Sequence, residues 1–105
     1  MPTTLTLDTT RGSDGAVALI AAGEIDLSNV DKFSKALTTA IAETGSGTPL
    51  TVDLTAVEYL DSAAINVLFP HAEQLHLVVH PLLTRVLSIS GLDQLTTIEP
   101  ESAKE

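Results

Sequence analysis

The residues best suited to chemistry are a serine and the aspartate before it, Ser62 and Asp61. They follow a segment from Leu50 in which apolar and polar residues alternate, and they precede an apolar stripe with helical spacing that begins at Ile65. The alternation predicts a buried strand and then a short loop, and the stripe predicts a helix. Aspartate is a preferred N-cap, so Ser62 is expected in the first helical turn. A hydroxyl there can accept a phosphoryl group or contact a partner, although serine also suits such a turn without any function.

The remaining chemistry-bearing residues predict neither a metal site nor an enzyme. His71, His76 and His80 are spaced by five and four residues, which does not place all three on one face of a helix or strand, and we interpret them as surface residues. No histidine is placed by sequence to activate Ser62, and no phosphate-binding loop or dinucleotide fingerprint occurs. We therefore predict no catalytic residues and no cofactor.

The length and composition predict one domain over residues 1–105. Apolar residues make up 44% of the chain, but only three residues are aromatic, so the core must be built from Leu, Val, Ile and Ala. The net charge of −9 and five scattered basic residues argue against direct nucleic-acid binding. The acidity either keeps the domain soluble or steers it toward a basic or mixed protein surface, and composition does not separate these two.

The hydropathy pattern predicts a soluble, cytoplasmic protein without a membrane span. The longest apolar run, Ala16–Ala22, is far shorter than the roughly 20 residues that a spanning helix needs. The N-terminal residues lack the basic start and long apolar run of a secretory signal.

The first half of the chain predicts a hairpin followed by a helix. Thr3–Thr10 alternates as a strand, Arg11–Gly15 is a turn by composition, and Ala16–Ala22 is an apolar strand expected to be covered on both faces. Gly23–Leu27 is expected to leave that strand as a loop. Ser28 is the predicted N-cap of the next helix, with a capping box completed three residues later. The helix face consists of Val30, Phe33, Ala36, Leu37, Ala40 and Ile41, and the helix is expected to end near Glu43, where Gly45, Gly47 and Pro49 follow.

The second half predicts two further helices and two strands. Pro70 should end or kink the helix that starts at Ser62, with Phe69 biased away from helical dihedrals. Leu75–Val79 alternates as a strand, and Pro81 suits the first turn of a helix whose predicted C′ cap is Gly91. The inner face of that helix is assigned to Leu82, Leu83, Val86, Leu87 and Ser90. Leu95–Glu99 is the last expected strand, and a polar tail starts at about Pro100. The order β-β-α-β-α-β-α-β predicts an α/β fold with a mixed sheet, largely parallel after the hairpin, and helices packed on it.

Two short motifs resemble the STAS domain of bacterial anti-sigma factor antagonists. They are Gly-Glu-Ile-Asp at 23–26 and Tyr-Leu-Asp-Ser at 59–62, and the Ser-Gly-Leu at 90–92 fits the end of the family's last helix. The similarity spans nearly the whole chain. It implies a partner-switching protein that binds an anti-sigma factor, often a serine kinase of the histidine-kinase-like ATPase fold, and thereby frees a sigma factor.

The resemblance also assigns roles to individual residues. It implies that the kinase phosphorylates Ser62, that the phosphorylated protein releases its partner, and that a phosphatase restores binding. Asp61 carries over as part of the switch motif, and Asp26 as a loop carboxylate beside it. The expected partner-binding residues are Asp61, Asp26, Glu24, Gly23 and Asn66.

Two departures from the family pattern leave an alternative open. Ala63 and Ala64 stand where the family has Ser or Thr and then Gly, and the stretch from Ser62 to the next strand is shorter than usual. The alternative is a regulatory or scaffold STAS domain that is never phosphorylated and binds a protein partner or a small ligand.

Overall fold

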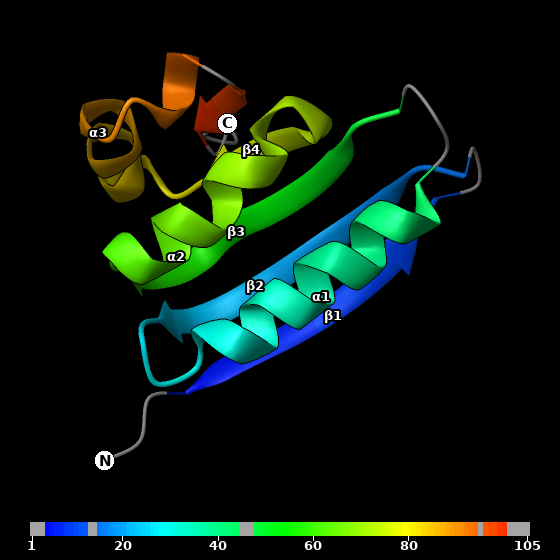
Figure 1. Cartoon of the computed structure of the whole chain (residues 1–105), viewed down its shortest axis with the longest axis horizontal. Helices are drawn as coiled ribbons and strands as arrows, with labels where there is room; N and C mark the ends of the chain where they lie inside the picture. Colours follow the sequence, from blue (N-terminus) through cyan, green and yellow to red (C-terminus); the bar gives the residue numbers. More distant parts are fainter. Residues whose placement is uncertain (1–3, 13–14, 45–47, 95, 101–105) are drawn as a thin grey trace, which may run out of the picture.

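The computed structural model describes residues 4–12, 15–44, 48–94 and 96–100, which form a five-stranded sheet and three α-helices (Figure 1). The strands are β1 (Leu5–Arg11), β2 (Val17–Ile25), β3 (Leu50–Leu60), β4 (Leu75–Val79) and β5 (Thr97–Pro100). The helices are α1 (Val30–Glu43), α2 (Ser62–Leu68) and α3 (Pro81–Ile89). Two 3₁₀ helices, η1 (Phe69–Gln74) and η2 (Leu92–Gln94), follow α2 and α3.

The elements follow one another along the chain as predicted, and the strands lie in the sheet in the order β1-β2-β3-β4-β5. β1 and β2 pair antiparallel, because a short turn joins them, and β2 to β5 are parallel, because a helix connects each strand to the next. The carboxyl ends of β2, β3 and β4 therefore meet at one edge of the sheet. The connections that lead into α1, α2 and α3 start at this edge.

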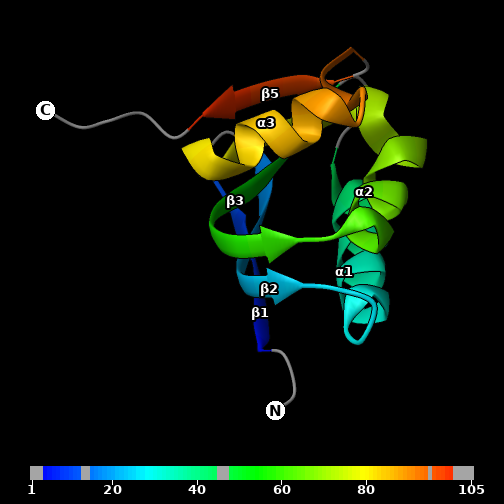
Figure 2. The same cartoon turned by 90° about the vertical axis from the view of Figure 1, so that its left-hand side faces the viewer.

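The core lies between the sheet and the helices. The alternating residues of β3 and the inner stripe of α1 are fully buried, with Leu50, Val52, Phe33 and Leu37 all 0% exposed. α1 and α2 lie on the same face of the sheet (Figure 2). The opposite face of β2 is only half-buried at Ala18, Ile20 and Ala22, so the expectation that this strand is covered on both faces was wrong.

β2 continues through Gly23 and Glu24 to Ile25, where a loop was expected. Gly23 has φ +110°, and an ideal Cβ placed on it would lie 2.2 Å from the Thr4 backbone oxygen. The same oxygen accepts a bond from the Glu24 amide at 3.0 Å. Only glycine lets the two strands approach this closely, and the pairing with β3 shifts register at this point.

β3 also runs further than predicted, to Leu60, and no loop separates it from Asp61. Its last buried residues, Val57 and Leu60, are three apart rather than two. The irregular register with β2 explains this break in the alternation, since Glu24 and Ile25 still pair with Tyr59 and Leu60.

α1 starts at Val30, with Asn29 in the N-cap position, so Ser28 is not the cap and the expected capping box does not form. The buried stripe of α1 and its end at Glu43 confirm the helix itself, although Gly45 and Gly47 lie outside the described residues.

α2 ends after two turns, one of the two expected outcomes, but Phe69 adopts helical dihedrals (φ −54°, ψ −48°), so the predicted bias was wrong. The chain tightens into η1, in which Pro70 occupies an early position that needs no backbone N–H.

α3 begins at Pro81 as predicted, and Gly91 follows it with φ +88°. Its inner face is narrower than expected: Leu83 and Leu87 are buried, whereas Leu82 is 79% and Val86 39% exposed. Helical spacing finds neighbouring residues but does not fix how the helix is rotated on the sheet. β5 starts two residues later than expected, and Leu95 and the tail from 101 lie outside the described residues.

Candidate functional site

Asp61 organises the junction between β3 and α2. Its Oδ1 accepts bonds from the Ala63 amide at 2.9 Å and the Ala64 amide at 3.2 Å, which confirms the predicted N-cap. These bonds satisfy two of the amides that a helix start leaves unpaired. The cap fixes the direction in which α2 leaves the sheet.

Asp61 also joins this junction to the end of β2. Its amide donates to the Ile25 oxygen at 3.2 Å, and its Oδ2 accepts from the Leu27 amide at 3.2 Å. One side chain therefore positions both the start of α2 and the loop after β2. The sequence predicted the cap but not this cross-link, because residues 27 and 61 are distant in the chain.

Ser62 is exposed at the first position of α2, and its hydroxyl makes no hydrogen bond within the part of the chain that the structure describes. Asn66 follows one helical turn later, also exposed, on the same side of α2. Ala64 is fully buried, so its methyl group contributes to the core. The structure thus brings together Asp61, Ser62 and Asn66 as predicted.

The loop 26–29 is held closed by two of its own side chains. Asp26 Oδ1 accepts bonds from the amide and the hydroxyl of Ser28. Asn29 is only 8% exposed; its Oδ1 accepts from the Asp26 amide at 3.0 Å and its Nδ2 donates to the Glu24 oxygen at 2.9 Å. Asn29 is not among the site residues that the sequence predicted. The available signal was an asparagine three residues after an aspartate at the end of a strand.

The other two expected site residues lie at the same edge but have different surroundings. Gly23 is part of the β1–β2 contact described above, and the close approach of Thr4 explains why this position is a glycine. Glu24 is exposed and pairs in register with Tyr59, itself 50% exposed, on the side of the sheet opposite the buried Ile25 and Leu60. Leu27, 77% exposed, stands beside the junction.

Two of the histidines have structural partners. His76 Nε2 lies 2.7 Å from Glu99 Oε1, and His80 Nδ1 accepts from the Leu82 amide at the start of α3. No group of three metal-binding side chains occurs in residues 4–12, 15–44, 48–94 and 96–100. Within the same ranges, every helix is too short or too polar to cross a membrane.

Comparison with known proteins identifies the family. The family described as "Mlab, STAS domain" matches residues 9–98. This chain belongs to the STAS domain family. A Mycobacterium tuberculosis (strain ATCC 25618 / H37Rv) protein, Rv2638, is 32% identical over 100 residues, covering 88% of this chain and 68% of the relative. Rv2638 carries a provisional assignment as an anti-anti-sigma factor.

Solved structures show that this STAS domain has the SpoIIAA-like fold. An anti-sigma factor antagonist from Mycobacterium paratuberculosis superimposes with a TM-score of 0.80 at 25% identity, over 93% of this chain and 87% of that one. The anti-sigma factor antagonist SpoIIAA, in its unphosphorylated form, superimposes with a TM-score of 0.69 at 18% identity, over 92% and 89%. The second likeness bears on the fold alone.

Proposed function

We propose that this STAS domain is an anti-sigma factor antagonist whose binding is switched off by phosphorylation of Ser62. The observation that carries the proposal is the exposed Ser62 hydroxyl, which lies beside the Asp61 cap and bonds to none of the described residues, in a chain whose relatives are assigned as antagonists. The partner is an anti-sigma factor with a serine kinase of the histidine-kinase-like ATPase fold. A phosphatase restores the free serine, and the exchange takes place in the cytoplasm. The domain itself acts by binding and not by catalysis.

The position of Ser62 suits a switch that leaves the fold intact. In the transfer, the Ser62 oxygen bonds to the γ-phosphorus of ATP as ADP leaves, and the hydroxyl proton passes to a base on the kinase. The phosphate adds about −1.5 to −2 charges. Asp61 already occupies the amides of Ala63 and Ala64, so the phosphate gains few bonds from the helix end and projects outward. Its charge therefore acts on the bound partner.

The proposed partner surface surrounds this serine. It comprises Ser62 and Asn66 on α2 with Asp26 in the adjoining loop, while Gly23 and Glu24 contribute from the end of β2. Asp61 positions this surface and does not bind the partner through its carboxylate, because both carboxylate oxygens already accept bonds from backbone amides.

The test is incubation with the anti-sigma factor kinase and ATP, followed by intact-mass measurement. The wild-type chain should gain the mass of one phosphate, and Ser62→Ala should gain none. Thr39→Ala, which removes an exposed hydroxyl on α1, is the matched control and should be phosphorylated like the wild type. A phosphate that persists in Ser62→Ala would refute the assignment.

The departure at Ala63 and Ala64 supports a second candidate, a STAS domain that binds its partner without phosphorylation. Here the kinase test would give no transfer to the wild-type chain, while stable binding to another STAS protein or a sensor persists.

A further inference from the structure

A second exposed patch lies on α3. Among the large hydrophobic residues that the structure describes, five are exposed, and three of these belong to this one helix: Leu82, Val86 and Ile89, at 79%, 39% and 78%. Their spacing of four and three residues places them along one side of the helix. Arg85 lies in the same stripe and is also exposed. We call Leu82, Arg85, Val86 and Ile89 the outer stripe of α3.

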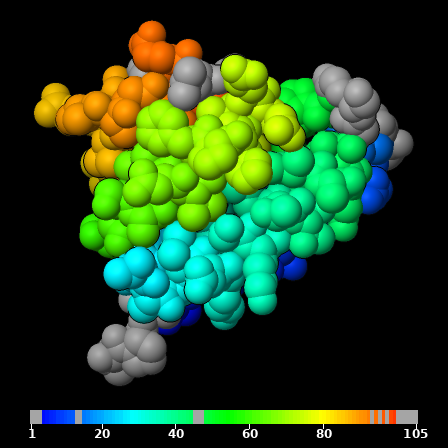
Figure 3. All heavy atoms as spheres, in the orientation of Figure 1, coloured from blue at the N-terminus to red at the C-terminus, as the bar shows by residue number. Residues whose placement is uncertain are grey.

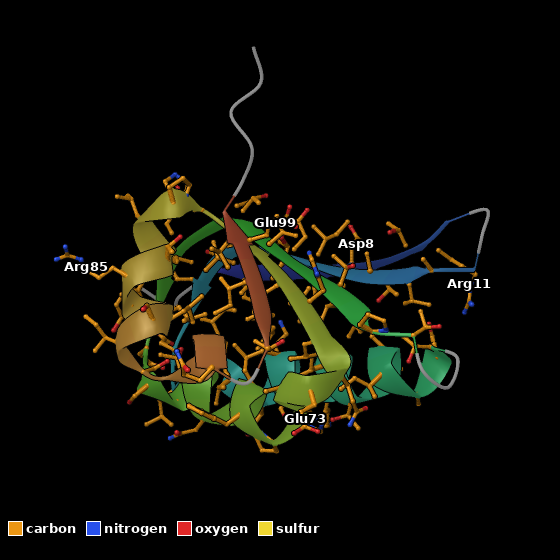
Figure 4. The ribbon with its side chains drawn as sticks, turned by 90° about the horizontal axis from the view of Figure 1, so that it is seen from above. Asp8, Arg11, Glu73, Arg85 and Glu99 are labelled. Carbon is orange, nitrogen blue, oxygen red and sulfur yellow. The ribbon has the colours of Figure 1, made fainter. Side chains whose placement is uncertain are left out.

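The charge of this stripe contrasts with the rest of the protein. Arg85 is the only lysine or arginine between residues 36 and 103, in a chain of net charge −9. α3 contains no acidic residue, and Arg85 forms no ion pair within the described ranges. Its side chain points away from the body of the molecule (Figure 4). An apolar stripe around one exposed guanidinium suits a surface that is apolar and carries a carboxylate.

The stripe faces the same end of the molecule as Ser62. Arg85 points toward the left-hand side in Figure 4, and this side faces the viewer in Figure 2, where the β3–α2 junction is also in front. In the space-filling view, the loop before α1, the start of α2 and α3 follow one another along the left-hand edge (Figure 3). One partner can therefore cover both.

We propose that the outer stripe of α3 docks an amphipathic helix of the anti-sigma factor, with a carboxylate of that helix opposite Arg85. This inference rests on the proposed function for the identity of the partner. Arg85 lies near the middle of the stripe, so two copies packed antiparallel through α3 would place their two arginines against each other. Such a dimer would also bring together two chains that each carry a net charge of −9. One helix face is also small beside the roughly 800 Å² per partner of a stable interface. Both points favour a different protein that also contacts the Ser62 end.

The test measures binding of the purified anti-sigma factor to the unphosphorylated chain by calorimetry. Leu82→Ala and Ile89→Ala should each weaken binding at least about tenfold, because each removes an aliphatic side chain that the complex would bury. Arg85→Glu should weaken it at least as much, because it places a like charge opposite the carboxylate of the partner. Lys35→Glu on α1 is the matched control for the charge reversal and should change affinity less than threefold. Thermal unfolding should be unchanged in the alanine variants, because both side chains are exposed.

Ser62→Asp, measured in parallel, separates this proposal from the switch. If Ser62→Asp binds like the wild type while the α3 variants lose affinity, the phosphorylation switch fails and the docking surface stands. If Ser62→Asp loses affinity while the α3 variants bind like the wild type, the docking surface is refuted. Sedimentation should show a monomer; a wild-type dimer that Arg85→Glu or Ile89→Ala dissociates would make a second copy the occupant and overturn the proposal.

Discussion

At the scale of single residues, Asp61 makes the hydrogen bonds that hold the two segments of the site together. Its two carboxylate oxygens accept three backbone amides, from Leu27, Ala63 and Ala64. A cap of this kind holds Ser62 at a fixed place, yet leaves the serine hydroxyl exposed. The family motif assigns Asp61 to the switch. In this chain, Asp61 positions the backbone around Ser62.

Two substitutions of Asp61 test separately the α2 cap and the bond from the Leu27 amide. Asp61→Ala should lower the free energy of unfolding by about 1–2 kcal/mol, because the α2 cap and the Leu27 bond are both lost. Asp61→Asn keeps one acceptor oxygen and should cost less than about 1 kcal/mol, while the Leu27 amide still loses its partner. Urea unfolding measures the first effect, and amide hydrogen exchange of Leu27 the second. Equal stability of Asp61→Ala and the wild type would contradict this role.

Asn29 provides an independent test of the loop beside the site. Asn29→Ala removes the side-chain bonds to the Asp26 amide and the Glu24 oxygen in a part-buried place, and should lower the free energy of unfolding by about 1–3 kcal/mol. Asn29→Asp retains the acceptor but not the donor, and should be intermediate in chemical denaturation. If Asn29→Ala unfolds at the wild-type urea concentration, the loop does not depend on these bonds.

Sequence reasoning found the local part of the site and missed its long-range part. The Asp61 cap and the position of Ser62 follow from rules that involve only the next few residues. The bond from Leu27 to Asp61 depends on β2 and β3 being neighbours, and the contacts of Asn29 depend on how the loop closes. Neither could be read from residue spacing alone.

At the scale of elements, the close approach of β1 and β2 at Gly23 fixes the end of β2 that carries the loop 26–29. The sequence predicted that the strand ends before this glycine, whereas β2 continues through it to Ile25. Pro81 correctly predicted the start of α3, but apolar spacing assigned Leu82 and Val86 to its inner face. Periodicity defines a stripe, whereas the contacts with β3, β4 and β5 decide which side of the helix faces inward.

Gly23→Ala tests the strand contact. A Cβ would meet the Thr4 backbone oxygen at 2.2 Å in a conformation that side chains rarely adopt, so the free energy of unfolding should fall by at least about 2 kcal/mol. Gly91→Ala is the matched control: its φ of +88° is similarly positive, but no atom lies within 4 Å of the added Cβ, and about 1 kcal/mol is expected. Thermal unfolding of both variants gives the comparison. A smaller loss for Gly23→Ala than for Gly91→Ala would show that the strands do not meet as described.

At the scale of the whole molecule, the parallel strands place the connections into α1, α2 and α3 at one edge of the sheet. This topology brings the loop after β2, the β3–α2 junction and the start of α3 to one end, although they are separated by tens of residues. The core lies behind this end, so a change at Ser62 alters the surface without entering the packed interior. This arrangement supports the proposed binding switch, in which the fold is preserved.

The most direct test of that claim compares the affinity of the anti-sigma factor for the chain with and without phosphate on Ser62. The account predicts that phosphorylation weakens binding more than about a hundredfold, equivalent to about 3 kcal/mol, while the midpoint of thermal unfolding stays unchanged. Equal affinity of the two forms, or a loss of affinity that accompanies unfolding of the phosphorylated chain, would contradict it.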